Sequence, residues 1–102
     1  MPLDRPVTVQ PWMEWRYTES NLVARCRIDG KPGLATLTVK AHGKEFPDCL
    51  KIKEWAEAWL KDNETTCEEF CAAANHAIGF DTTVEWFSDS HGMITARVYR
   101  ER

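Results

Sequence analysis

The sequence lacks several features that would assign it to a class of proteins at once. Its 102 residues contain no apolar run near the roughly 20 residues that cross a membrane, and its first residues contain no apolar stretch typical of a signal peptide. The net charge is −3, so no excess of positive charge favours contact with nucleic acid or an anionic membrane. It has no glycine-rich phosphate loop, no nucleophile elbow and no Cys-x-x-Cys pair. We therefore expect a cytoplasmic protein without cofactor or metal, and without membrane or direct nucleic-acid contact.

The chain does have the composition of a folded domain. Apolar residues make up 43% and charged residues 28% of it, which suits one globular domain over residues 1–102. The four cysteines are expected to be reduced thiols in the cytoplasm. Five tryptophans are many for this length, and we expect more of them than the core can hide.

Hydrophobic periodicity predicts two hairpins that enclose two helices. Three prolines in residues 1–11 predict an extended N-terminal segment. Alternation of apolar and polar residues predicts strands at 12–17, 22–28, 35–40, 83–87 and 93–99, with turns at 29–33 and 88–92. A repeat of 3.6 residues predicts helices at 48–62 and 65–78, the first capped by Asp48 and the second ended by Gly79.

These elements place the protein in the α+β class. They predict a two-layer (β)ββααββ domain in which two consecutive helices pack on one face of an antiparallel sheet. The predicted core follows the apolar stripes: Leu22, Ala24, Ile28, Leu37, Val39, Ile52, Trp55, Trp59, Phe70, Ala74, Ile78, Val84 and Val98. The opposite face of the sheet is predicted to be polar: Arg25, Arg27, Thr36, Thr38, Lys40, Glu85 and Arg97. Such a face is solvated, binds an anionic ligand or lines a barrel.

Three cysteines allow a chemical interpretation beside a structural one. Cys67 and Cys71 share a helix face that suits a metal ion, but the face is otherwise apolar, so we expect core packing. Cys49 falls in the first turn of a helix, where free N–H groups favour a thiolate. Cys49 is thus the candidate reactive thiol, with His42 as its base. The neighbouring Asp48 disfavours a thiolate and Cys49 also fits the apolar stripe of the helix, so we expect core packing.

One histidine also has two interpretations. His91 lies in the 88–92 turn with Asp89, and a loop histidine near a carboxylate can act as a general base or bind a metal. Histidine in a polar turn is more often only solvated. We expect the solvated role for His91 and predict no catalytic residue and no metal ligand.

The order of the elements resembles a known family. The segment Thr65-Thr-Cys-Glu-Glu-Phe-Cys-Ala-Ala-Ala-Asn and the closing strands are similar to the tunnelling fold of GTP cyclohydrolase, pyruvoyl-tetrahydropterin synthase and the deazapurine nitrile reductase. The resemblance implies ββααββ units that assemble into barrels, with purine- or pterin-like ligands between subunits. It makes Arg25, Arg27, Glu85 and Arg97 the candidate ligand-binding residues. The His-x-His zinc pair of the family's synthases is missing from this sequence.

Two functions from different classes follow. The first is a small cytoplasmic binding or regulatory protein that acts by contact with another protein, a class that includes acidic viral inhibitors which occupy a basic groove. Its candidate partner-binding residues are Trp12 and Trp15, on opposite faces of one strand, because tryptophan is enriched at interface hot spots. The alternative is an oligomeric tunnelling-fold enzyme or ligand binder, closed through edge strands 12–17 and 93–99.

Overall fold

The sheet and the two helices lie in separate layers. The computed structural model describes residues 13–43, 45–89 and 91–99, so the predicted N-terminal segment 1–11 and Trp12 lie outside it. The elements in chain order are β1 (Glu14–Arg25), β2 (Pro32–His42), α1 (Cys49–Asp62), α2 (Cys67–Ile78), β3 (Asp81–Ser88) and β4 (Gly92–Val98). The four strands pair antiparallel in the order β1-β2-β3-β4.

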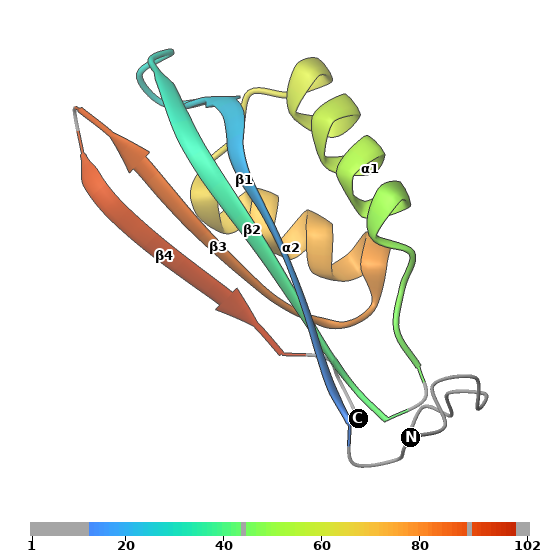
Figure 1. Ribbon diagram of the computed structural model, residues 1–102. Coiled ribbons are helices and arrows are strands. Elements are labelled where there is room, and N and C mark those ends of the chain that lie inside the picture. Colours follow the sequence, from blue (N-terminus) through green and yellow to red (C-terminus); the bar gives the residue numbers. More distant parts are fainter. Residues whose placement is uncertain (1–12, 44, 90, 100–102) are drawn as a thin grey trace.

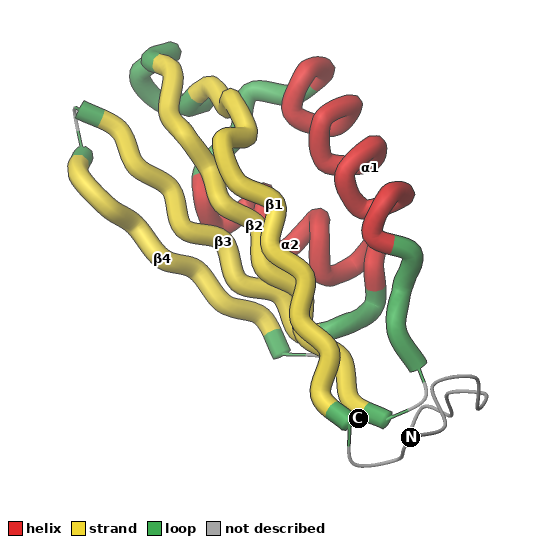
Figure 2. The backbone as a smooth tube through the Cα atoms, in the orientation of Figure 1, coloured by secondary structure: helices red, strands yellow, loops and turns green. Residues whose placement is uncertain are grey.

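Both helices cover the same face of the sheet (Figure 1). Helix α1 packs against β1, and α2 packs against β3 and β4. The twisted sheet leaves its other face without a covering element among the described residues (Figure 2). The predicted two-layer α+β architecture is therefore confirmed. In the part of the chain that the structure describes, no helix combines the length and apolar character needed to cross a bilayer.

The helices begin and end where the capping residues predict. The Asp48 carboxylate accepts a hydrogen bond from the Leu50 N–H at 2.9 Å and caps α1. Thr66 caps α2, because its hydroxyl accepts from the Glu69 N–H at 3.2 Å. Gly79 ends α2 with a φ of 81°, a left-handed conformation that favours glycine.

The first strand differs from its prediction. The strands predicted at 12–17 and 22–28 form one strand, β1, with a register shift between Glu19 and Leu22. One extra residue is inserted there, so that Tyr17 and Glu19 before the bulge and Leu22 after it all face the helices. Asn21 adopts a φ of 60° in the bulge, and asparagine tolerates this left-handed region better than most residues.

The core lies between the helices and the inner face of the sheet. Phe70 is fully buried, and its ring stacks on Trp55 and Trp59 with centroid distances of 6.1 and 5.6 Å. Of the predicted core residues, eight are buried and four are partly buried against them: Leu22, Ala24, Leu37, Val39, Ile52, Phe70, Ala74 and Val84, and then Trp55, Trp59, Ile78 and Val98. The prediction for Ile28 is wrong. Strand β1 ends at Arg25, and Ile28 lies 76% exposed in the following turn.

The core also accommodates the tryptophans that the structure describes. Trp86 is buried, and Trp15 is half-buried with its ring stacked on Tyr17 and Phe46. With Trp55 and Trp59 half-buried as well, none of these four side chains is left fully exposed. The core thus buries one of these four tryptophans completely and the other three in part. The more exposed apolar side chains lie elsewhere.

Candidate functional site

The face of the sheet opposite the helices, here called the open face, carries a continuous line of apolar side chains. Val23 pairs with Leu34, Leu34 with Phe87, and Phe87 with Met93, so the four residues cross all four strands side by side. We call them the apolar row. Their exposed fractions are 70%, 49%, 47% and 61% in that order. Solvated sheet faces are ordinarily polar, and contiguous exposed apolar side chains mark interaction sites.

Away from the apolar row the open face becomes polar and charged. The successive cross-strand rows are Thr36–Glu85–Thr95, Thr18–Thr38–Thr83–Arg97 and Arg16–Lys40–Asp81. The hydroxyls of Thr18 and Thr38 are hydrogen-bonded at 3.3 Å. The Arg97 guanidinium lies 4.7 Å from the centroid of the Tyr99 ring, in a cation–π contact. The open face thus joins an apolar end to a charged end.

The four predicted ligand-binding residues do not meet. Glu85 and Arg97 lie in adjacent rows of the open face. Arg25 lies at the end of β1, where its guanidinium donates to a carbonyl of the β1–β2 loop at 2.9 Å. Arg27 was predicted on the same face, but it follows the strand and donates to Glu69 of α2 at 2.9 Å. Only Glu85 and Arg97 remain candidates for a common ligand.

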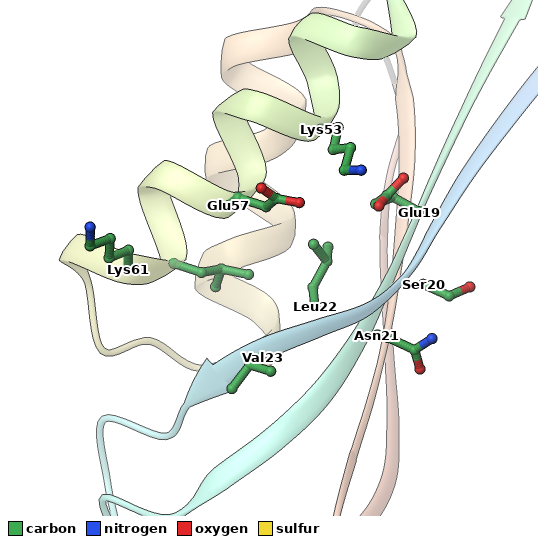
Figure 3. A pocket seen from close by; sticks show the side chains of 9 residues that line it. Glu19, Ser20, Asn21, Leu22, Val23, Lys53, Glu57 and Lys61 are labelled. Carbon is green, nitrogen blue, oxygen red and sulfur yellow. The ribbon is translucent and has the colours of Figure 1, made fainter.

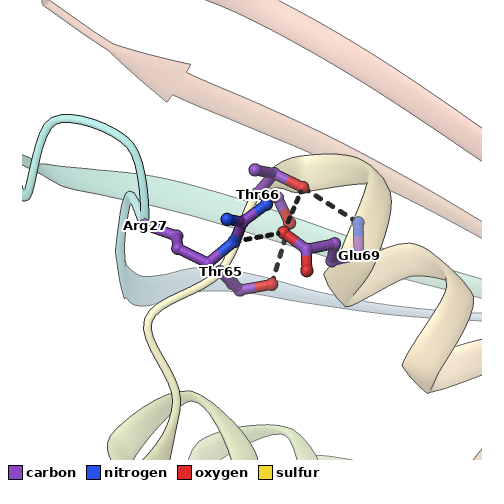
Figure 4. A network of polar contacts seen from close by, with 4 residues as sticks. All are labelled: Arg27, Thr65, Thr66 and Glu69. Atoms are coloured by element: carbon purple, nitrogen blue, oxygen red, sulfur yellow. Dashed lines mark hydrogen bonds and ion pairs between the residues drawn. The ribbon is translucent and has the colours of Figure 1, made fainter.

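Arg27 has a structural partner instead. Glu69 accepts hydrogen bonds from Arg27 and from the Thr66 hydroxyl, at 2.9 and 3.0 Å (Figure 4). The bond from Arg27, followed by that from Thr66, lowers the pKa of the Glu69 carboxyl. Two backbone hydrogen bonds flank Cys26. The Arg27 N–H donates to the Thr65 carbonyl, and the Thr65 N–H donates to the Arg25 carbonyl. These contacts hold the end of β1 against the start of α2.

A groove lies at the bulge, between β1 and α1. It has a volume of about 410 Å³ and is lined by charged side chains from both elements. Lys53 and Glu57 point from α1 toward Glu19 of β1 (Figure 3). Tyr17 donates a hydrogen bond to Glu19, and burial, followed by this bond, raises the Tyr17 pKa above its ordinary value. Because charges of both signs line the groove, it favours no class of charged ligand.

The predicted thiols occupy three different settings. Cys67 and Cys71 are buried, and their thiols donate to the carbonyls of Val84 and Thr82, both at 3.6 Å. Burial raises the pKa of Cys67 to about 11 and also raises that of Cys71, so both stay protonated. Their assignment to the core is confirmed. Cys49 is exposed at the start of α1, so the prediction that it packs in the core is wrong.

A pH titration checks the burial of Cys67. Its pKa rises from 9.0 to about 11 in the folded protein, so the folded state keeps a proton that the unfolded chain loses first. We expect the resulting stabilisation to be complete below pH 9 and to disappear as the pH rises through 11. Cys67→Ala, which costs about 1 kcal/mol at neutral pH, should therefore approach the wild type in stability in alkaline solution. Urea unfolding at several pH values measures this.

The matched control for that titration is Cys49→Ala, which removes an exposed thiol. It is expected to unfold at nearly the wild-type urea concentration at neutral pH. A difference between Cys67→Ala and wild type that stayed constant from pH 8 to 11 would contradict the buried thiol.

Three residues that sequence reasoning left apart meet at one end of the sheet. Asp29 Oδ2 and His91 Nε2 are hydrogen-bonded at 2.9 Å, and Cys26 Sγ lies within 4.8 Å of an atom of each. His91 was paired with Asp89, and Cys26 was left unassigned. The pairing of β2 with β3 brings the β1–β2 loop and the β3–β4 turn to the same end (Figure 1). Two of the three residues, Asp29 and His91, lie in the predicted turns 29–33 and 88–92. An antiparallel sheet that pairs the two hairpins brings those turns together.

No family model, no characterised protein and no solved structure matches this chain. The similarity to the tunnelling fold thus stays a prediction that rests on the ββααββ order.

Proposed function

We propose that the protein acts by binding another protein through the open face of its sheet. The observation that carries this proposal is the apolar row, which crosses all four strands on the face that the helices do not cover. Full burial of an aliphatic or aromatic side chain contributes roughly 1.5–3 kcal/mol. Four neighbouring side chains that are about half exposed or more therefore offer a partner a substantial binding energy.

The surroundings of the row indicate the chemistry of the partner. A depression of about 270 Å³ lies beside Val23, Leu34 and Phe87 and has room for one apolar anchor. The cationic side chains on the open face, Arg16, Arg25, Lys40 and Arg97, outnumber the acidic ones, Glu14, Asp81 and Glu85. The chain as a whole is acidic, with a net charge of −3. The face therefore fits a protein segment with apolar residues beside acidic ones.

The four cysteines form no disulfide, which is compatible with a reducing compartment. The cytoplasm is where we propose that this partner meets the protein. An acidic segment should reach the cationic face faster at low salt than at high salt. Salt dependence therefore separates this partner from one that binds by apolar contact alone.

Matched variants test the proposal. Phe87→Glu places a charge in the apolar row, and Leu50→Glu places the same charge at the exposed Leu50 of α1. In a pull-down from native lysate, we expect wild type and Leu50→Glu to capture the same partner protein. Phe87→Glu should bind that partner at least about 30-fold more weakly, as expected for a hot-spot residue. Arg97→Glu should weaken binding mainly at low salt.

Two results would contradict the proposal. One is equal capture by all variants, with circular dichroism confirming that each is folded. The other is a captured protein whose affinity responds to Leu50→Glu but not to Phe87→Glu. A wild type that self-associates through Phe87 would show that the occupant of the face is a second copy.

A second function rests on a different observation. The outermost strands are β1 and β4, so β4 of one copy can pair with β1 of the next and close a barrel. The open face then lines the interior, with Glu85 and Arg97 available to a purine- or pterin-like ligand. Light scattering tests this oligomeric, tunnelling-fold alternative. A monomer at tens of micromolar would remove it, because one sheet cannot enclose a ligand.

A further inference from the structure

We propose that Cys26, Asp29 and His91 form a zinc-binding site at the hairpin end of the sheet. One potential ligand atom from each residue, the Cys26 Sγ, a carboxylate oxygen of Asp29 and a ring nitrogen of His91, lies within 4.8 Å of the other two. They are a sulfur, an oxygen and a nitrogen, all of which zinc accepts. The site is separate from the apolar row and does not depend on the proposed function.

The backbone holds Cys26 in place from both sides. Its N–H donates to the Lys31 carbonyl and its carbonyl accepts from the Gly30 N–H, both at 2.9 Å. A parallel bridge to Thr65 anchors it to the start of α2. The thiol therefore projects from a fixed point, although it lies just after the end of a strand.

The other two residues are also held. Asp29 accepts a hydrogen bond from the Lys31 N–H at 2.9 Å through Oδ1, which leaves Oδ2 directed at His91. The His91 N–H donates to the Ser88 hydroxyl at 3.2 Å. The bond to Asp29 orients a ligating carboxylate in the way that outer-shell hydrogen bonds do, and the backbone bond fixes the position of His91 in the turn. The Asp29 side chain is 23% exposed and the His91 side chain 47%, so an ion can reach them.

The arrangement fits a metal better than a catalytic triad. In a triad the two nitrogens of the histidine bind the nucleophile and the carboxylate on opposite sides, which keeps those two groups apart. Here the carboxylate of Asp29 lies within 4.8 Å of the Cys26 sulfur as well as of His91. A carboxylate this close disfavours a thiolate unless a cation lies between them. The three groups lie close to one another, as the ligands of one metal ion do.

Zinc is the ion that suits these ligands best. Thiolate and imidazole together favour zinc, whereas magnesium and calcium select oxygen ligands. Tetrahedral zinc at its usual bond lengths places ligand atoms about 3.5 Å apart, so modest side-chain rotations close the observed cluster. The ion would replace the hydrogen bond between Asp29 and His91.

A fourth position is left for a ligand from solution. A cavity of about 240 Å³ borders Cys26 and His91 and has apolar walls from Ile28, Trp86 and Ile94. Cys67 also lines it, but its thiol is bonded to backbone carbonyls and stays protonated. Three protein ligands and one open position are typical of zinc sites that bind water or a small anionic ligand.

Zinc titration of the purified protein tests the site. The background is Cys49→Ser, because that exposed thiol would compete for metal. Calorimetry is expected to show one zinc ion per chain at micromolar concentrations. Cys26→Ser, Asp29→Asn and His91→Ala should each weaken binding at least about tenfold, while His76→Ala, at an exposed histidine of α2, should not.

Two further readouts identify the ligands. Cobalt in place of zinc should give a thiolate-to-metal charge-transfer band that Cys26→Ser abolishes, and zinc should protect Cys26 from maleimide. Circular dichroism verifies that each variant is folded. The absence of zinc binding by the parent protein would overturn the proposal. So would variants of Asp29 and His91 that bind as tightly as His76→Ala, because the metal would then be held by a surface thiol alone.

Discussion

Phe70→Ala is expected to lower the free energy of unfolding by about 3–5 kcal/mol. The Phe70 ring is fully buried and stacks on Trp55 and Trp59 of α1 with centroids 6.1 and 5.6 Å away. Those two rings also stack on each other, at 6.0 Å, so neither is free to fill the space. The loss is a large part of the 5–15 kcal/mol typical of a whole domain. Urea denaturation measures it.

The control is the same substitution on the other side of the sheet. Phe87 is 47% exposed on the open face, so Phe87→Ala should change the unfolding free energy by less than about 1 kcal/mol. Equal losses at the two positions would mean that the helices do not cover the face described. A folded Phe87→Ala protein also separates partner binding from stability.

Gly33→Ala is expected to be the next most damaging of these substitutions. A Cβ atom at this buried position would lie 2.2 Å from Nε1 and 2.9 Å from Cε2 of Trp86, and 3.0 Å from the Phe87 carbonyl oxygen. The indole is itself buried, so it cannot move without disturbing its neighbours. Overpacking of this kind costs about 1–3 kcal/mol. The midpoint of urea unfolding should fall accordingly.

A second background shows whether the indole causes that loss. In Trp86→Leu the atoms nearest the added methyl group are absent, so Gly33→Ala should cost much less there than in the wild type. The double-mutant cycle then gives a large coupling between the two positions. An equal cost in both backgrounds would assign the effect to the backbone of β2 instead.

The sequence was sufficient for features that depend on neighbours along the chain. Helix stripes and caps such as Asp48 and Thr66 are local, so both helices were predicted close to their observed ends. The bulge had a local signal too. Inward-facing residues change from odd numbers at Tyr17 to even numbers at Leu22, but this change fits two short strands as well as one bulged strand. Gly33 was assigned to the turn. In the structure it lies in β2, where the Trp86 indole leaves no room for a Cβ atom.

The candidate surfaces depend on contacts between distant parts of the chain. On the open face, Val23, Leu34, Phe87 and Met93 are each the one apolar residue of their strand, and only the cross-strand register places them in one row. Periodicity gives the face of a residue but not its neighbour on the next strand. The predicted polar residues of the open face, such as Glu85, were therefore found while the apolar row was missed.

The central seam of the sheet, between β2 and β3, closes across both helices and joins residues as far apart as Leu34 and Phe87. The outer hairpins close over short loops, so loop-closure entropy favours them early and makes the seam the slow step of folding. Val23 and Cys26 belong to the first hairpin, and Phe87 and His91 belong to the second. Neither the apolar row nor the cluster of Cys26, Asp29 and His91 is assembled until the seam has formed. Binding of a partner or a metal ion would therefore select the completely folded chain and slow its unfolding, while half-formed intermediates gain nothing from either.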